Sequence, residues 1–571
     1  MKKLVIFVFA TIALMGCKNG EGFLDKNPDM RASIDTKQKV QLLLVSAYTE
    51  GCTATILDFT SDNVIDNDAP DKTGHCRNLL PLDKMYDEIF GWEPVVSSGQ
   101  QDSPKFLWDA HYSAIAAANQ ALQAIEKLEA QGIDMTAEKA EAKMIRAYHH
   151  FLLTMVFCQA WRDAELSKQD LGVVYMTTPE TAVKPHYDRP SLAETYACIE
   201  KDLEEALPNI SDGYYSVPKY HFNVAAANAF AARFYLYTRQ WEKAIVCANA
   251  VLGTDDATTL SKLFDHYYEH IVATDIDQGM NAWIDIKSPS NLLLHTTMTQ
   301  APYTIYPNYG RYQSKDDALK YSLEGSGPCW GNRSLIGALS IWSYGSDQYG
   351  SFLSKFYYKF EYTDKVNGYG YIHGVTRAFT SDETLLVRAE ARVYAGDEEG
   401  AINDLRLWCE NMNVRKRVMN MNPDSTVALN YNIINDFYTK NYGTPYAPEL
   451  HQEEVVPGWE ITERQLPLIH CCLHFRRIET FHDGLRLQDL KRYGIEFTHK
   501  QGTKPEMTME VRDERLAIQL PQEVMLAGMT PNPRTKQSTP TSGSVVTTAP
   551  TDSLAKNLPP IGLGTPIMVT K

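Results

Sequence analysis

The chain has 571 residues and a formal net charge of -16 at pH 7. That length permits a large buried core, and the acidic balance excludes an electrostatic match to phosphate backbones or anionic lipid surfaces, so nucleic acid is not an expected partner. After the first sixteen residues, no run approaches the roughly 20 apolar residues that a membrane-spanning helix needs.

The N-terminus has the order of a secretory signal peptide. Two lysines are followed by an apolar stretch at residues 4–14 that is too short to span a bilayer. Residues 14–17 read Leu-Met-Gly-Cys and resemble a bacterial lipobox, in which the cysteine after the cleavage site receives the acyl chains. We therefore expect residues 1–16 to be removed and Cys17 to be the lipid attachment site. The alternative is an ordinary secretory signal with an incidental cysteine.

The body of the chain, residues 17–534, is predicted to be mostly helical. Residues 223–252 place small side chains before Tyr235, then a break, and then Trp241 with apolar residues at helical spacing. This is the spacing of a tetratricopeptide-type helix pair, in which small residues let two helices approach and aromatic residues fill the gap. Residues 383–408 repeat the pattern. The sequence therefore predicts an all-α, tetratricopeptide-like superhelix forming one domain.

Two segments depart from this pattern. Residues 254–380 form a long central insert that is rich in Gly, Pro, Ser and aromatic residues and lacks helical periodicity. A long non-repeat segment on a rigid scaffold is where function tends to lie. Residues 535–571 are rich in Thr, Ser, Pro and Gly, which predicts a flexible tail.

Nine cysteines remain after Cys17. The number is odd, so at least one is unpaired or bonded outside the chain. Those within helix-like apolar patterns are interpreted as small core residues: Cys158, Cys198, Cys247 and Cys409. The one pairing that we single out is Cys52 with Cys76.

The motifs of common enzyme classes are missing. The sequence contains no Gly-x-Ser-x-Gly elbow, His-Glu-x-x-His pair or Walker loop. Residues 470–474, His-Cys-Cys-Leu-His, offer zinc ligands without a second cluster, and the aspartates of residues 58–71 lack the glycine and glutamate of a calcium loop. We interpret the first as a buried helix face and the second as a solvated loop, and we expect no enzymatic activity, metal or cofactor.

Aromatic residues point to a ligand. Residues 303–349 are much denser in Tyr and Trp than the rest of the chain and are broken by Pro and Gly. Rings on loops suit stacking on sugar rings or on peptide side chains, whereas the alternative is that they pack the insert against the helices. We predict ligand contacts from rings of the insert and of the loop at residues 90–94, with two polar partners: Trp92, Tyr306, Tyr309, Tyr312, Trp330, Arg77 and Asp68.

Several local motifs follow one another in the order of a known family. Phe-Leu-Asp-Lys-Asn-Pro at 23–28 precedes Asp-Phe-Thr-Ser-Asp-Asn at 58–63. Arg-Ala-Tyr-His-His-Phe at 146–151 and Glu-Thr-Leu-Leu-Val-Arg-Ala-Glu-Ala at 383–391 follow. The most specific is Arg-Arg-Ile-Glu-Thr-Phe-His-Asp-Gly-Leu-Arg-Leu-Gln-Asp-Leu-Lys-Arg at 476–492, whose alternating charges are typical of ties between helices. With these motifs the chain resembles the SusD/RagB family of surface lipoproteins, which accompany TonB-dependent outer-membrane transporters in Bacteroidetes.

The resemblance implies a function as well as a fold. Family members bind glycans with aromatic residues from the loop before the helix that opens here near Phe106 and from the central insert. The expected protein is anchored to the outer membrane only through its lipid, faces the cell exterior, and delivers an oligosaccharide to a SusC-like, TonB-dependent transporter without breaking a bond. The family also includes peptide binders, so a peptide is the alternative ligand. Two more hypotheses stay open: a surface glycoside hydrolase, whose paired carboxylates need be close only in space, and a scaffold for protein partners.

Overall fold

The computed structural model describes residues 33–535 apart from internal gaps. The gaps are residues 71–72, 77–78, 80, 82, 98, 181–185, 265–280, 301–310, 315–324, 332–340, 344–350, 354–356 and 413–427. The predicted signal peptide, Cys17 and all but the first residue of the predicted tail therefore lie outside the described residues. Within the described ranges the chain is mainly helical with small antiparallel sheets, which confirms the predicted fold class.

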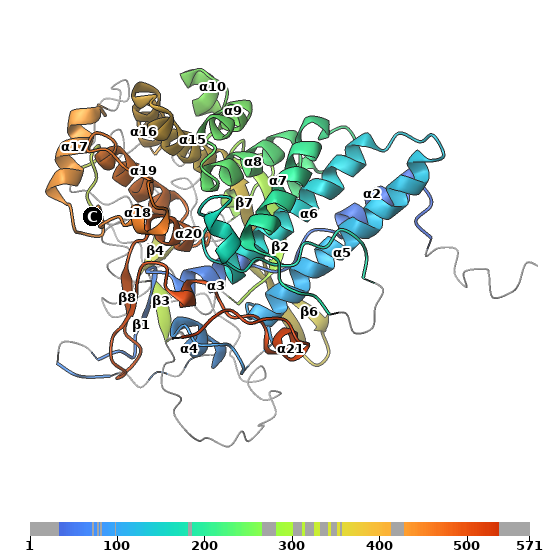
Figure 1. Cartoon of the computed structure of the whole chain (residues 1–571), viewed down its shortest axis with the longest axis horizontal. Helices are drawn as coiled ribbons and strands as arrows, with labels where there is room; N and C mark the ends of the chain where they lie inside the picture. The colour runs from blue at the N-terminus through green and yellow to red at the C-terminus, as the bar shows by residue number, and fades with distance from the viewer. Residues whose placement is uncertain are drawn as a thin grey trace, which may run out of the picture.

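A layer of long helices forms one side of the molecule. α5 (Pro104–Glu129) starts with proline at its first position, and the hydroxyl of Ser103 accepts a hydrogen bond from the Phe106 amide to cap it. α6 (Thr136–Phe157) packs along α5, and α7 (Leu192–Ala206) packs on α6, so the three lie side by side (Figure 1). Short elements precede them: α2 (Lys37–Val45), α3 (Thr53–Thr60), β1 (Val64–Asp66) and α4 (Met85–Phe90).

The two predicted repeat units are helix pairs, as expected. α8 (Val224–Tyr237) and α9 (Trp241–Leu252) form the first, and α15 (Ser381–Ala395) and α16 (Glu398–Asn411) form the second. The alanines of α8 that face the core are buried, so neighbouring helices approach closely there. α9 packs on α15 and thereby joins the two pairs. The short helix α10 (Asp256–Lys262) follows α9.

The C-terminal part of the described chain closes the superhelix. α19 (Leu466–Glu479) packs on α15 and α17, while α20 (Arg486–Tyr493) contacts α3 from the other end of the chain. The remaining elements of this part are α17 (Tyr431–Lys440), α18 (Gln452–Val455), β8 (Phe497–His499), β9 (Met507–Met509) and α21 (Gln522–Leu526).

The central insert contains strands that the sequence analysis did not predict. β2 (Asn291–Met298), β7 (Tyr369–Thr380) and β6 (Tyr357–Asp364) form an antiparallel sheet in the order β2-β7-β6. Its inner end packs against α8 and α15. β3 (Tyr312–Ser314) pairs with β1, and β4 (Ile341–Ser343) pairs with β5 (Ser351–Leu353). The described part of the insert is therefore held on the helices by a sheet.

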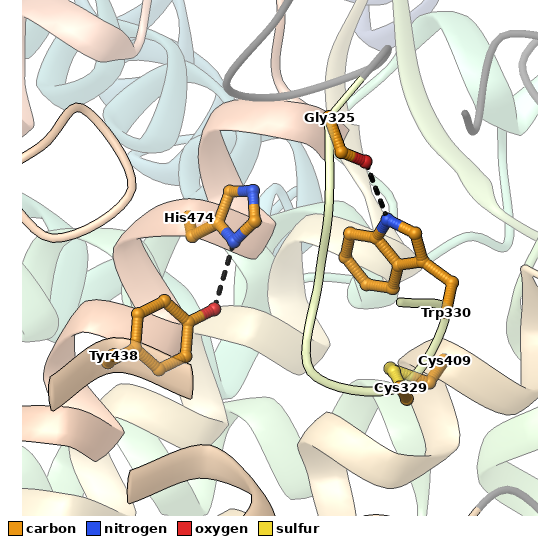
Figure 2. Close-up of a disulfide and its surroundings, with 6 residues drawn as sticks. All are labelled: Gly325, Cys329, Trp330, Cys409, Tyr438 and His474. Carbon is orange, nitrogen blue, oxygen red and sulfur yellow. Dashed lines mark hydrogen bonds between the residues drawn. A yellow bond between two sulfur atoms is a disulfide. The ribbon is translucent and has the colours of Figure 1, made fainter. Parts of the chain in front are cut away.

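The disulfide in the structure is not the predicted one. Cys329 of the insert is bonded to Cys409 of α16, and the adjoining Trp330 lies between the insert and the helices (Figure 2). Cys409 is therefore more than the small core residue that its helical pattern indicates. Cys52 and Cys76 are both free thiols, so the pairing predicted for them is wrong. Cys52 is buried at the start of α3, where it packs as a small core side chain.

The arginine-rich segment at 476–492 ties helices together. Buried Arg476 donates two hydrogen bonds to Asp489 at 2.8 and 2.9 Å, and it forms a 2.5 Å ion pair with Glu390 of α15. Glu390 also accepts hydrogen bonds from Arg492 and Tyr493. Burial raises the pKa of Glu390, but the two guanidinium groups outweigh burial and hold that pKa below its usual range. These residues therefore form an internal ion-pair network.

Loss of one charge in this network should be costly. Glu390→Gln removes the carboxylate that Arg492 contacts and leaves Arg476 with Asp489 alone. We therefore expect the free energy of unfolding to fall by about 3–5 kcal/mol in urea denaturation. The matched control is Glu398→Gln, which breaks the solvent-exposed ion pair with Arg464 and should cost at most about 1 kcal/mol. Similar losses in the two variants would contradict the structural role of Glu390.

Buried histidines give the fold a dependence on pH. His295 of β2 is 5% exposed and makes edge contacts with Tyr48 and Tyr148, and burial lowers its pKa to about 4. His111 and His149 of α5 and α6 place their Nδ1 atoms 3.2 Å apart, and burial lowers the pKa of His111 to about 3. In the unfolded chain these histidines bind protons as the pH falls through about 6.5. Their contribution to the free energy of unfolding is therefore fully present above that pH and is lost as the pH falls towards their pKa in the folded protein.

Replacing one histidine should weaken that dependence by a defined amount. Between pH 7 and pH 5 the contribution of His295 to the free energy of unfolding falls by about 2 kcal/mol. His295→Leu should reduce the measured loss by this amount when urea midpoints at the two pH values are compared. His186→Leu, at a site with a side chain 67% exposed, serves as the control and should retain the parent's pH dependence. An unchanged loss in His295→Leu would contradict the assignment.

Candidate functional site

Three of the predicted ligand-binding rings lie in the core. Trp92 is 5% exposed, stacks on His499 at a centroid distance of 4.4 Å, and donates its indole N–H to the Thr60 carbonyl. Trp330 is fully buried, packs on Phe475, and donates its indole N–H to the Gly325 carbonyl at 2.9 Å (Figure 2). In this arrangement protein covers their faces, as the packing alternative requires. Their role in ligand binding stays a prediction.

Tyr312 is also buried, within a polar cluster that joins β1 to β3. Its hydroxyl donates to Asp87, while Arg311 binds both oxygens of Asp66 at 2.6 and 2.8 Å. Asp66 also accepts from the Gly502 amide at 2.8 Å. The hydrogen bonds to Asp66 raise the pKa of Arg311, so this guanidinium stays charged. Its members bind one another, and the cluster fixes the position of the strands.

Of the four remaining predicted ligand-binding residues, the structure describes only Asp68. Asp68 is half-buried, and its carboxylate accepts the Leu79 amide at 3.2 Å. Arg77, Tyr306 and Tyr309 lie outside the described residues.

The structure places a different set of rings in solvent, on the hairpin of β6 and β7. We call the exposed Phe360, Tyr362 and Tyr369, together with the half-buried Tyr371, the aromatic hairpin. Phe360 and Tyr369 are each 39% exposed, and Tyr362 is 53% exposed. These values contrast with the burial of Trp92, Trp330 and Tyr312, because the outer half of the hairpin extends beyond the helices that cover its inner end (Figure 1).

The local sequence explains the hairpin. The amides of Val366 and Asn367 donate to the Asp364 carboxylate, and Gly368 has φ +72°, which a side chain would disfavour. Tyr362 pairs with Gly370, so no side chain from β7 covers that part of its ring. Phe360 lies on the same face, and its ring contacts that of Tyr362 edge to face at 4.9 Å.

The loop before α5 is tied to this hairpin. Gln101 Nε2 donates to the Ile372 carbonyl at 3.2 Å, and Ile372 is the strand partner of Phe360. Val96 of the same loop is 60% exposed. The two regions that the resemblance implies for ligand binding, the loop before α5 and the central insert, therefore meet at the aromatic hairpin.

This arrangement suits recognition by ring faces. Exposed rings with phenolic edges stack on the apolar faces of sugars or of peptide side chains and offer a hydroxyl at the rim. Within the described ranges no group of three or more His, Cys, Asp or Glu side chains gathers to hold a metal ion. The sequence contains a pattern that predicts the hairpin, namely alternating aromatic residues on both sides of Asn367-Gly368. We did not use this pattern, because we gave more weight to the denser run of rings at 303–349.

Comparisons with known proteins show a family match over part of the chain. Residues 22–236 match a SusD-like family described as starch-binding and associating with the outer membrane. The fold likeness extends over most of the chain. A Bacteroides vulgatus protein whose proposed role is sugar binding is 19% identical with a TM-score of 0.58, over 88% of this chain and 99% of its own. The chain is therefore similar to a SusD-like family over residues 22–236, and it shares the SusD fold.

Two further solved structures share the SusD fold. A SusD superfamily protein from Bacteroides thetaiotaomicron has 16% identity and a TM-score of 0.54 over 87% of this chain and 99% of its own. A laminarin-binding SusD-like protein has 16% identity and a TM-score of 0.52 over 87% and 99%. No curated protein sequence matches the SusD-like chain. Among its described helices, none is long and apolar enough to cross a membrane.

The burial of the predicted rings leads to a test of packing. Trp92→Ala and Trp330→Ala each remove a large side chain from the core, so we expect the free energy of unfolding to fall by about 3–5 kcal/mol in urea denaturation. Tyr362→Ala removes an exposed ring and should change it by no more than about 0.5 kcal/mol. Unchanged stability in either tryptophan variant would contradict the packing described above.

Proposed function

We propose that this SusD-like protein is a non-catalytic, cell-surface lipoprotein that binds an oligosaccharide and delivers it to a TonB-dependent, SusC-like transporter in the outer membrane. The aromatic hairpin is proposed to bind the ligand, with Trp92, Arg77, Asp68, Tyr306, Tyr309, Tyr312 and Trp330 supporting or extending the site. Cys17 is the proposed lipid attachment site, and residues 17–534 form the proposed single domain with a tail beyond it.

The exposed rings carry the proposal. Large apolar side chains in water are costly unless a partner covers them, and here several occur together on one rigid hairpin. Matches to a starch-binding family and to the fold of a laminarin-binding protein favour a glycan as that partner. The exposed rings offer stacking surfaces, which suit binding of a glycan.

Removal of the rings should abolish this recognition. With a panel of glycans led by laminarin and starch oligosaccharides, we expect one glycan class to bind the chain from residue 18 onwards in calorimetry. Phe360→Ala combined with Tyr362→Ala should weaken that binding at least tenfold, about 1.4 kcal/mol, because two stacking surfaces are lost.

The control variant removes an exposed ring from a different part of the protein. Tyr442 follows α17 and is 52% exposed, so Tyr442→Ala removes an equally exposed ring at a site away from the hairpin and should leave affinity unchanged. Equal affinity in the double variant and the parent would contradict the proposed site. Binding of peptides alone would favour a peptide ligand, and release of a shortened glycan by the purified chain would favour a hydrolase.

A further inference from the structure

A second recognition feature lies away from the aromatic hairpin. A cavity of about 370 Å³ opens between α5, the segment that follows residue 173, and the segment around α21. That volume falls in the range of ligand-sized pockets, about 300–1,000 Å³. Its walls are mainly apolar and include Trp108, Tyr112, Met176, Val524 and Met529. No residue of the aromatic hairpin lines it.

Most polar groups of the walls bind one another or the backbone, including Lys105 with Asp109 and Tyr187 with Glu180, and Glu523 adds a carboxylate at the wall. The Tyr112 hydroxyl donates to the Val174 carbonyl at 2.9 Å, and the Asn119 side-chain amide donates to the Met176 carbonyl at 2.9 Å. The apolar part of the wall offers few partners to the hydroxyl groups of a sugar. The rings and methyl groups suit an apolar chain, which makes the cavity unlike the aromatic hairpin.

One hydrogen-bond donor of the apolar lining, the indole N–H of Trp108, has no partner among the residues that the structure describes. The indole face contacts Tyr112 at a centroid distance of 4.8 Å. Two adjacent rings with a free N–H are the elements that bind proline-rich segments, whose extended backbone presents carbonyl groups to such donors. The expected occupant is therefore an apolar, proline-containing stretch of polypeptide.

The chain itself contains such a stretch. Residues 558–569 read Leu-Pro-Pro-Ile-Gly-Leu-Gly-Thr-Pro-Ile-Met-Val and have no charged residue. The preceding residues, 536–557, are mostly Thr, Ser, Pro, Ala, Lys and Asp. The apolar block therefore stands at the end of a polar connecting segment, as a tethered ligand would.

The described chain ends six residues after a lining residue of the cavity. Met529 is one of its lining residues, and the last described residue, Thr535, is held by hydrogen bonds from its amide and hydroxyl to Glu514. The six residues from 530 to 535 span at most about 20 Å, so Thr535 lies within that distance of Met529. A flexible connection of the length of residues 536–557 has a root-mean-square extension of about 25 Å. The apolar block can therefore return to the cavity, at an effective concentration of about 1 mM.

We propose that residues 558–569 dock in the cavity between α5 and α21 of the same chain. The docked segment covers apolar surface on α21 and places the end of the chain on the body of the protein. This inference is independent of the glycan-binding proposal, because it uses a different surface and a different ligand chemistry.

Hydrogen exchange of the α21 region, residues 522–529, tests the docking in the chain from residue 18 to residue 571. Ile561→Asp with Leu563→Asp places two charges in the apolar block, so we expect exchange at 522–529 to become about five- to tenfold faster. Val545→Asp with Val546→Asp places the same charges in the connecting segment and should leave exchange unchanged. A synthetic peptide of residues 556–571 should bind a chain ending at Thr535 and slow exchange at the same residues.

Two outcomes overturn the proposal. Equal exchange in the parent and in the two double-aspartate variants would mean that the tail does not cover α21. Faster exchange in both variants would mean that charge in the tail, not docking of residues 558–569, sets the exchange rate of α21. Ala527→Glu, which introduces a charge at an exposed position of the cavity wall, checks the other side of the contact. It should speed exchange at residues 522–526 as the Ile561 and Leu563 changes do, and no change would also overturn the proposal.

Discussion

Guanidinium groups buried between helices constrain the arrangement of the body. A buried charge is tolerated only with its counter-ion and hydrogen-bond partners in place, so each pair admits few alternative packings of the two elements that carry it. The pairs join α6 to α7, α8 to α15, α15 to α16, and α20 to the loop after α3: Arg146–Asp202, Arg233–Glu383, Arg388–Asp404 and Arg486–Asp62. The last joins the two ends of the described chain. The insert is attached to this frame by packing of β2 and β7 on α8 and α15 and by the Cys329–Cys409 bond.

The frame was also the part that the sequence predicted best. Small residues before Tyr235 and a short turn after α15 mark two helix pairs in the sequence, because both features depend on residues close together in the chain. Both helix pairs occur as expected. The carboxylates and arginines of 476–492 predicted ties between helices, and Arg476 with Asp489 shows that tie. In contrast, the Cys329–Cys409 bond joins residues 80 positions apart, and nothing in local spacing identifies such a pair.

The candidate site was harder to predict because ring burial is a property of tertiary structure. Trp92 and Tyr362 have similar apolar surfaces and both follow loop-like sequence, but only Trp92 faces an element that can cover it, the β8 strand with Phe497 and His499. Tyr362 faces Gly370 across the hairpin and remains in solvent. Residue type identifies rings that suit stacking, whereas the partner across the strand decides which of them are available.

The exposed rings and the apolar cavity have different consequences for binding. The aromatic hairpin is held at its inner end by pairing of β7 with β2 and at Ile372 by Gln101, so its rings are largely fixed before a ligand arrives. Less conformational entropy is then lost on binding, and the open rim keeps water available to a hydroxyl-rich ligand. The cavity beside α21 is lined mainly by rings and apolar side chains, so it suits such a ligand less well. One scaffold thus presents a wet stacking surface for ligands from outside and a drier pocket for an apolar chain.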